Sequence, residues 1–156
     1  MQKIDCIYII NLKKERSRLK QTLMLLADEE IYVPIKIFEA THWKSEFFEK
    51  NVYENEMHYS QIWRENGNKI RKGQIACCYS HLKLLQDAVD NNYQTILLLQ
   101  DDVYCETIGQ MKKEIDKFHD LIQRHNDFDL YYVGKQKVYP LLEEAKFRDT
   151  SFLETE

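Results

Sequence analysis

The stretch Ile96-Leu97-Leu98-Leu99-Gln100-Asp101-Asp102-Val103 decides the fold, because an uninterrupted apolar run leads directly into two adjacent carboxylates. A continuous apolar run of this length is typical of a strand covered on both faces, as in an α/β sheet. Such sheets bind ligands beyond the carboxyl ends of their strands, which is where Asp101 and Asp102 would lie. Two adjacent carboxylates repel each other unless a cation lies between them, so the segment predicts a site for Mg²⁺ or Mn²⁺. An acidic turn without a ligand is the alternative reading.

The chain before this strand alternates between strand and helix. Residues 3–10 are β-branched and aromatic, which predicts a first strand ending at Asn11. A helix over about 17–28 follows, because Leu19, Leu23 and Leu26 recur at helical spacing, and residues 35–38 form a second predicted strand. Strand, helix and strand in this order begin a parallel sheet with right-handed crossovers.

Two more helices and a last strand complete the predicted fold. A helix over about 72–90 is expected to pack on the sheet through an apolar face, and Asn91-Asn92 can end it. The residues predicted for that face are Ile75, Cys78, Leu82, Leu85 and Val89. A helix over about 111–122 and a strand over 129–133 follow. We therefore expect an α/β fold over 1–156, a single domain with a mostly parallel sheet flanked by helices.

The polar segment from His42 to about Asn68 is rich in aromatic residues and shows no clear period. A stretch of this kind predicts short helices or a functional flap between the regular elements. Its rings are expected to pack in the core, with stacking on a ligand as the alternative.

Composition narrows the classes of partner. A net charge of −4 argues against a nucleic-acid-binding protein, whose surface would be basic. The N-terminus lacks the pattern of a signal peptide and no apolar run could cross a bilayer, so we expect a cytoplasmic protein. The cysteines show no paired spacing and are expected to be reduced core residues; they are Cys6, Cys77, Cys78 and Cys105.

Two groups of basic residues offer candidate phosphate contacts, because each lies near the start of a predicted helix. Solvated surface charge is the simpler reading of both groups. The first comprises Lys13, Lys14, Arg16, Arg18 and Lys20, and the second Lys69, Arg71 and Lys72.

Three separated segments together resemble the family-25 glycosyltransferases, which include bacterial lipooligosaccharide galactosyltransferases and collagen galactosyltransferases. The first is Ile10-Asn11-Leu12 with Arg18, the second runs from Gly73 to His81 and includes Ser80, and the third is Leu99-Gln100-Asp101-Asp102. Asp129 to Gly134 is similar to a later family segment. Their order along the chain is more specific than any one of them.

The resemblance implies a GT-A-like, Rossmann-like fold that transfers a hexose, galactose or glucose, from a UDP-sugar to an acceptor hydroxyl with inversion. It implies Asn11, Arg18, Ser80, His81 and Asp101 around the donor, and Mn²⁺ or Mg²⁺ on Asp101 and Asp102. The acceptor would be a glycan, as in LPS biosynthesis, or a hydroxylated protein, with peripheral membrane association where the acceptor is linked to lipid. The general base has no assignment.

Two departures from the family pattern keep alternatives open. Gln100 stands where the family usually has Glu, and the chain ends at Glu156, soon after Gly134, where members usually continue. A catalytically impaired relative that serves as a binding module is therefore one alternative. A nucleotidyltransferase is another, although no P-loop and no glycine-rich dinucleotide motif is present.

Overall fold

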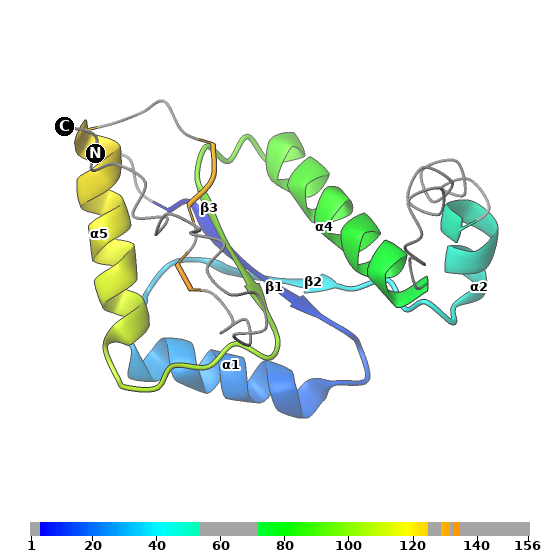
Figure 1. The fold of residues 1–156 in the computed structure, drawn as a ribbon, viewed down its shortest axis with the longest axis horizontal. Helices are drawn as coiled ribbons and strands as arrows, with labels where there is room; N and C mark the ends of the chain where they lie inside the picture. The colour runs from blue at the N-terminus through cyan, green and yellow to red at the C-terminus, as the bar shows by residue number, and fades with distance from the viewer. Residues whose placement is uncertain (1–3, 54–71, 125–128, 132, 135–156) are drawn as a thin grey trace, which may run out of the picture.

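The computed structural model describes residues 4–53, 72–124, 129–131 and 133–134, and over these ranges strands and helices alternate as predicted (Figure 1). The elements are β1 (Cys6–Asn11), α1 (Arg16–Asp28), β2 (Ile35–Glu39), α2 (Glu46–Phe48), the π-helix η1 (Glu49–Tyr53), α4 (Lys72–Asp90), β3 (Ile96–Gln100) and α5 (Gln110–Arg124). The predicted bounds of β3 and α4 agree with those observed, and the other predicted elements before α5 lie within a few residues of theirs.

The sheet has the order β2-β1-β3, and both pairings are parallel. Central strand β1 is buried along its whole length. The chain reaches β2 through α1 and returns past β1 to β3 through α4, so that α1 and α5 cover one face of the sheet and α4 the other (Figure 1). An α/β fold with a parallel sheet between helices is thereby confirmed, in agreement with a Rossmann-like GT-A arrangement.

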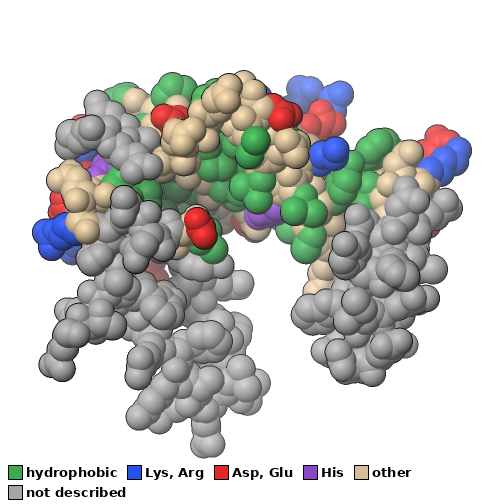
Figure 2. Space-filling view, turned by 90° about the horizontal axis from the view of Figure 1, so that it is seen from above, with side chains coloured by type: hydrophobic (Ala, Val, Ile, Leu, Met, Phe, Trp, Pro, Cys, Tyr) green, Lys and Arg blue, Asp and Glu red, His purple; other side chains and the backbone are tan. Residues whose placement is uncertain are grey.

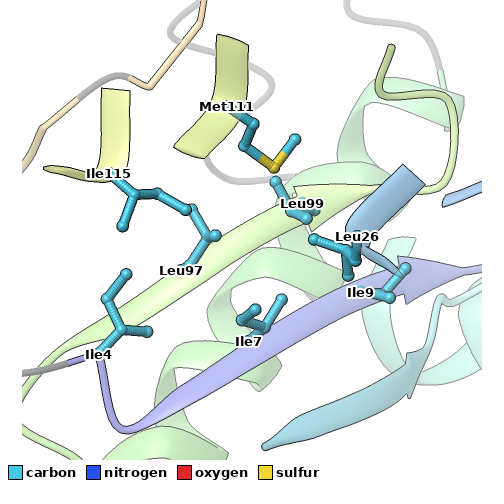
Figure 3. Packing of buried hydrophobic residues seen from close by; sticks show 8 residues of the cluster. All are labelled: Ile4, Ile7, Ile9, Leu26, Leu97, Leu99, Met111 and Ile115. Atoms are coloured by element: carbon cyan, nitrogen blue, oxygen red, sulfur yellow. The ribbon is translucent and has the colours of Figure 1, made fainter. Parts of the chain in front are cut away.

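Alternating residues of β1 build two cores. Ile7 and Ile9 pack with Leu97 and Leu99 of β3 and with residues of α1 and α5 on one face (Figure 3). Those helix residues are Leu26, Met111 and Ile115. Each such side chain contributes about 1.5–3 kcal/mol when it is fully buried. This core fixes the places of α1 and α5 and thus of the loops at the carboxyl edge.

The opposite face of β1 packs against α4. Tyr8 is completely buried there, with Leu84 and Ala88 of α4 in the same cluster. Its ring makes edge contacts with Phe38 and Tyr93, at centroid distances of 6.4 Å and 6.3 Å. A separate small cluster joins η1 and the flanking helix to the first turns of α4 through Phe48, Val52 and Ala76.

The predicted buried face of α4 was wrong. The residues that pack on the sheet side are Ala76, Ser80, Leu84 and Ala88, whereas Leu82, Leu85 and Val89 are 63%, 47% and 66% exposed. Figure 2 shows hydrophobic side chains at the surface over α4. Small side chains let a helix lie close to a sheet already filled by Tyr8, so the face with smaller residues is the buried one.

The prediction of a strand over 129–133 was also wrong for the residues that the structure describes, since 129–131 and 133 form no strand. Tyr131 packs instead on Phe118 of α5, with ring centroids 5.4 Å apart, and Val133 packs on the first core. Strand propensity reports the fit of a side chain to a half-buried surface, and here α5 supplies that surface.

Two further predictions concern the segment after His42 and the four cysteines. The segment after His42 forms short helices, α2 and η1, as one of its two readings predicted; its remainder from 54 to 71 lies outside the described residues, with Lys69 and Arg71. All four cysteines are free; Cys6 is buried in the second core and the partly buried Cys105 packs against the first, whereas Cys77 and Cys78 are exposed. The prediction of core cysteines was therefore wrong for Cys77 and Cys78.

Candidate functional site

The reversal of strand order at β1 defines where a ligand would bind. The crossovers to β2 and to β3 leave β1 in opposite directions, which opens a crevice beyond the carboxyl ends of β1 and β3. Asn11 ends β1, Gln100 ends β3, and the Asp101-Asp102 pair follows directly. The predicted acidic pair thus lies at the topological switch point of the sheet.

Two adjoining cavities lie along this edge. The smaller cavity, of about 170 Å³, is lined by residues from the ends of β1 and β3, the loop after β2, and α4. They are Ile10, Leu12, Ala40, Thr41, His42, Trp43, Gly73, Ala76, Cys77, Ser80, His81, Gln100 and Asp101. The larger cavity, of about 490 Å³, shares Leu12, Ala40, Thr41 and His42 with it and adds Lys13, Lys14, Glu39, Ser45 and Phe47. Only the larger volume is in the range of about 300–1,000 Å³ typical of small-molecule sites.

Asp101 is held by groups from β1 and α1. Its Oδ2 accepts a hydrogen bond of 2.7 Å from Asn11 Nδ2, and its Oδ1 lies 3.6 Å from Arg18 Nη1. The hydroxyl of the buried Thr22 donates to the backbone carbonyl of Asp101 at 3.2 Å. The Asp101 side chain is only 12% exposed. Two predicted donor residues, Asn11 and Arg18, therefore both contact a third, Asp101.

Asp102 has a different environment. It is exposed, and no hydrogen bond or ion pair holds its carboxylate within the described ranges. The pKa of the Cys77 thiol is raised, first by the loss of hydration around the thiol and next by Cys78. The negative charge of Asp102 adds to this effect, so Asp102 lies close to Cys77. Cys77 lines the smaller cavity, which places Asp102 near that cavity.

Ser80 joins α4 to the loop after β2. Its hydroxyl donates to the carbonyl of Ala76 at 2.7 Å and accepts a hydrogen bond of 2.9 Å from the backbone N–H of Thr41. The residue is 1% exposed. Ser80 thus shapes the wall of the smaller cavity, and its hydroxyl already has partners in the protein.

His81 lines the same cavity from the next position of α4. Burial lowers the pKa of its imidazole below the ordinary value of 6.5, because the charged form loses hydration. At neutral pH the ring is therefore uncharged, and it can either donate or accept a hydrogen bond. A zinc site needs several converging ligands. Among the described residues, no group of three or more His, Cys, Asp or Glu side chains could hold a metal ion with His81.

The carboxylates of Asp101 and Asp102 are the predicted ligands of Mg²⁺ or Mn²⁺. The described ranges hold no cluster of three metal-ligating side chains, and the carboxylate of Asp101 is already paired. Mg²⁺, however, commonly binds through one or two carboxylates together with substrate phosphates and water. Asp102 fits a cation that binds together with a diphosphate, and the described residues do not form a closed metal site of their own.

Several cavity residues had no assigned role in the predicted site, although ligand stacking was the alternative reading for the rings of their segment. His42 and Trp43 follow β2 and stack on each other, with ring centroids 6.1 Å apart and an angle of 21°. His42 Nδ1 accepts a hydrogen bond of 3.2 Å from the backbone N–H of Lys44, and Nε2 lies 3.4 Å from Lys14 Nζ. The sequence could have indicated both residues. Parallel strands end at the same edge of the sheet, so residues just after β2 must lie at that edge too.

Comparison with known proteins identifies the family. A model of glycosyltransferase family 25 (LPS biosynthesis protein) matches residues 4–155, so the chain belongs to this family. Human procollagen galactosyltransferase 2 is 31% identical over 139 residues, which cover 86% of this chain and 21% of that protein. Zebrafish (Danio rerio) procollagen galactosyltransferase 1 is 26% identical over 142 residues, covering 86% of this chain and 22% of that protein.

A third relative has a name that includes the word inactive. The rat (Rattus norvegicus) protein called probable inactive glycosyltransferase 25 family member 3 is 26% identical over 76 residues, or 48% of this chain and 13% of that protein. The chain therefore spans about a fifth of the two galactosyltransferases and less of this relative. Among the described residues no helix is both long and apolar enough to cross a membrane. A cytoplasmic location and a single domain stay predictions.

Proposed function

We propose that this chain forms the donor side of a glycosyltransferase that moves a hexose, galactose or glucose, from a UDP-sugar to an acceptor hydroxyl with inversion. One observation carries the proposal: residues from all three motif segments line one cavity at the switch point of the sheet. Family membership and the names of the galactosyltransferase relatives support the sugar class. A glycan or a hydroxylated protein would supply the acceptor hydroxyl.

In the proposed reaction the bonds form and break between the acceptor and the donor, and the protein forms no covalent bond to either. The acceptor oxygen forms a bond to the anomeric carbon while the bond from that carbon to the diphosphate oxygen breaks, and UDP leaves with the electron pair. The hydroxyl proton passes to a base. Bound Mg²⁺ or Mn²⁺ would neutralise charge on the departing diphosphate, a Lewis-acid role. The protein's part is to orient the donor and stabilise the developing charge.

His81 lines the cavity in which the donor would lie, and Arg18 lies beside it through its contact with the cavity residue Asp101. The Arg18 side chain is 52% exposed, and its guanidinium can form two parallel hydrogen bonds to a phosphate group. His81 presents a neutral imidazole to the cavity. Asn11 and Ser80, at 5% and 1% exposure, support the walls between which the donor would lie.

Gln100 favours a second candidate function, a binding module without turnover. Its side chain lines the smaller cavity at the end of β3, and a neutral amide there removes one negative charge beside Asp102. An amide binds a hard divalent cation less tightly than a carboxylate does. The rat relative with an inactive name belongs to the same family.

Calorimetry tests both functions. UDP-galactose and UDP-glucose are titrated into the chain with and without Mn²⁺, and we expect binding that tightens at least tenfold with Mn²⁺. Asp102→Asn should remove this gain, whereas Asp28→Asn, an exposed carboxylate at the end of α1, should keep it. If neither UDP-sugar binds in the presence of Mn²⁺, the proposal is wrong. Release of UDP by donor hydrolysis favours the enzyme, and binding without any turnover across an acceptor panel favours the module.

A further inference from the structure

We propose that Asp101 is a positioning residue: it anchors the turn after β3 to β1 and α1, and leaves Asp102 as the carboxylate of the pair that is available to a cation. This division of roles differs from a shared metal site on both residues. The part that concerns the cation rests on the proposed function, whereas the anchoring part does not.

The contacts of Asp101 come from two other elements. Asn11 at the end of β1 donates to one carboxylate oxygen at 2.7 Å, and Arg18 of α1 lies 3.6 Å from the other. Thr22, one turn further along α1, donates to the Asp101 carbonyl at 3.2 Å. Backbone and side chain of Asp101 are therefore both fixed, and the position of the next residue, Asp102, is determined by them.

Asn11 has no spare donor for a ligand. Its Nδ2 also donates to the carbonyl of Glu15 at 3.0 Å, and an amide nitrogen carries two hydrogens. With both hydrogens used and 5% of the residue exposed, Asn11 acts as a brace between the loop before α1 and the turn after β3.

Charge favours the same division. Arg18 offsets the negative charge of Asp101, so that Asp102 does not face an uncompensated second carboxylate. Asp102 is exposed and, within the described ranges, has no hydrogen bond or ion pair of its own. Since one carboxylate with diphosphate oxygens and water can hold Mg²⁺, the cation does not need Asp101.

Three variants test the proposal in the 156-residue chain. Asp101→Asn removes the negative charge that pairs with Arg18 and leaves Asn11 a weaker, uncharged acceptor, so it should lower Tm by about 2–6 °C. It should also speed hydrogen exchange in the turn after Gln100 about tenfold. Asp102→Asn should leave Tm and exchange as in the parent chain. Thr22→Val removes only the hydrogen bond to the Asp101 carbonyl. It should destabilise the turn less, and it replaces Asp101→Asn if that variant does not fold.

The cation readout is the ratio of the UDP Kd without Mn²⁺ to that with Mn²⁺. Asp101→Asn and Thr22→Val should weaken UDP binding while keeping most of this ratio, and Asp102→Asn should reduce it to about one.

Loss of the Mn²⁺ ratio in Asp101→Asn with an unchanged Tm would make Asp101 a ligand and overturn the proposal. If the parent chain does not bind UDP at all, the proposed function fails on its own. The Tm and exchange comparison still decides the anchor in that case, because equal values for Asp101→Asn and Asp102→Asn would refute it.

Discussion

Leu84 and Leu85 are neighbours in the chain, yet Leu84 is completely buried against the sheet and Leu85 is 47% exposed on α4. This pair allows a direct test of which face of α4 is packed. Leu84→Ala removes buried methyl groups and leaves a cavity beside Tyr8, so we expect a loss of about 2–5 kcal/mol in the free energy of unfolding. Urea denaturation monitored by circular dichroism measures it.

Leu85→Ala is the matched control, with the same change in side chain and in helix propensity. We expect it to cost less than about 1 kcal/mol, because a half-exposed leucine gains little from burial. Equal losses for the two variants would show that the face with Leu82, Leu85 and Val89 is also covered in solution, contrary to the structure.

The same helix shows what sequence could and could not predict. Its bounds were predictable from the apolar spacing and from Asn92, whose positive φ of 58° ends the helix. Its orientation was not, because two apolar stripes run along α4 and periodicity does not rank them. The buried stripe contains Ala76, Ser80 and Ala88, small residues whose burial depends on how closely the helix approaches β1.

The candidate site shows a similar limit. The chemistry at the end of β3 was predictable, because an apolar strand and an acidic pair are local features. That Asp101 pairs with Asn11 and Arg18 was not, since these contacts join residues far apart in sequence. His42 was within reach of the sequence, because the loop after β2 must lie at the same edge of the sheet as the acidic pair.

Glu29 links the end of α1 to the start of α5. It is 1% exposed, and its two carboxylate oxygens accept hydrogen bonds from the backbone N–H groups of Gly109 and Lys112, at 2.9 Å and 3.0 Å. A buried carboxylate at a helix N-terminus satisfies free donors and interacts favourably with the helix dipole. Glu29→Gln should therefore lower the free energy of unfolding by about 1–3 kcal/mol. Urea denaturation at pH 7 gives the value.

Glu30→Gln is the control for this change, since Glu30 is the adjacent residue and is exposed. It should change stability by no more than about 0.5 kcal/mol. Should Glu29→Gln prove as mild as Glu30→Gln, the two hydrogen bonds to the start of α5 would not be important for stability.

Asp87 connects α4 to both β1 and β2. Lys36 Nζ donates to both of its oxygens, at 2.9 Å and 2.6 Å, and the hydroxyl of Tyr8 donates at 2.5 Å. The hydrogen bond from Lys36, followed by that from Tyr8, lowers the pKa of Asp87 below 3.8. Because the folded state has the lower pKa, the stabilisation is complete above pH 3.8 and is lost as pH falls through the folded value.

Acid unfolding of Asp87→Asn measures this contribution. The variant should be less stable than the parent chain at pH 7, and the difference should shrink as the pH falls below about 4. Asp90→Asn, one turn away at the exposed end of α4, should run parallel to the parent curve. A difference that stays constant down to about pH 2 would mean that the charge of Asp87 does not matter for stability.

His81 gives the last prediction, because burial lowers the pKa of its imidazole. Its Hε1 resonance, assigned by its loss in His81→Gln, should titrate with a midpoint below 6.5. The midpoint should return to about 6.5 when the chain is unfolded in urea. Since the folded pKa is the lower one, the contribution of His81 to stability is present above pH 6.5 and declines as pH falls through the folded value. A folded midpoint at or above 6.5 would place the ring in contact with water or a carboxylate and would remove the argument that a neutral imidazole faces the donor cavity.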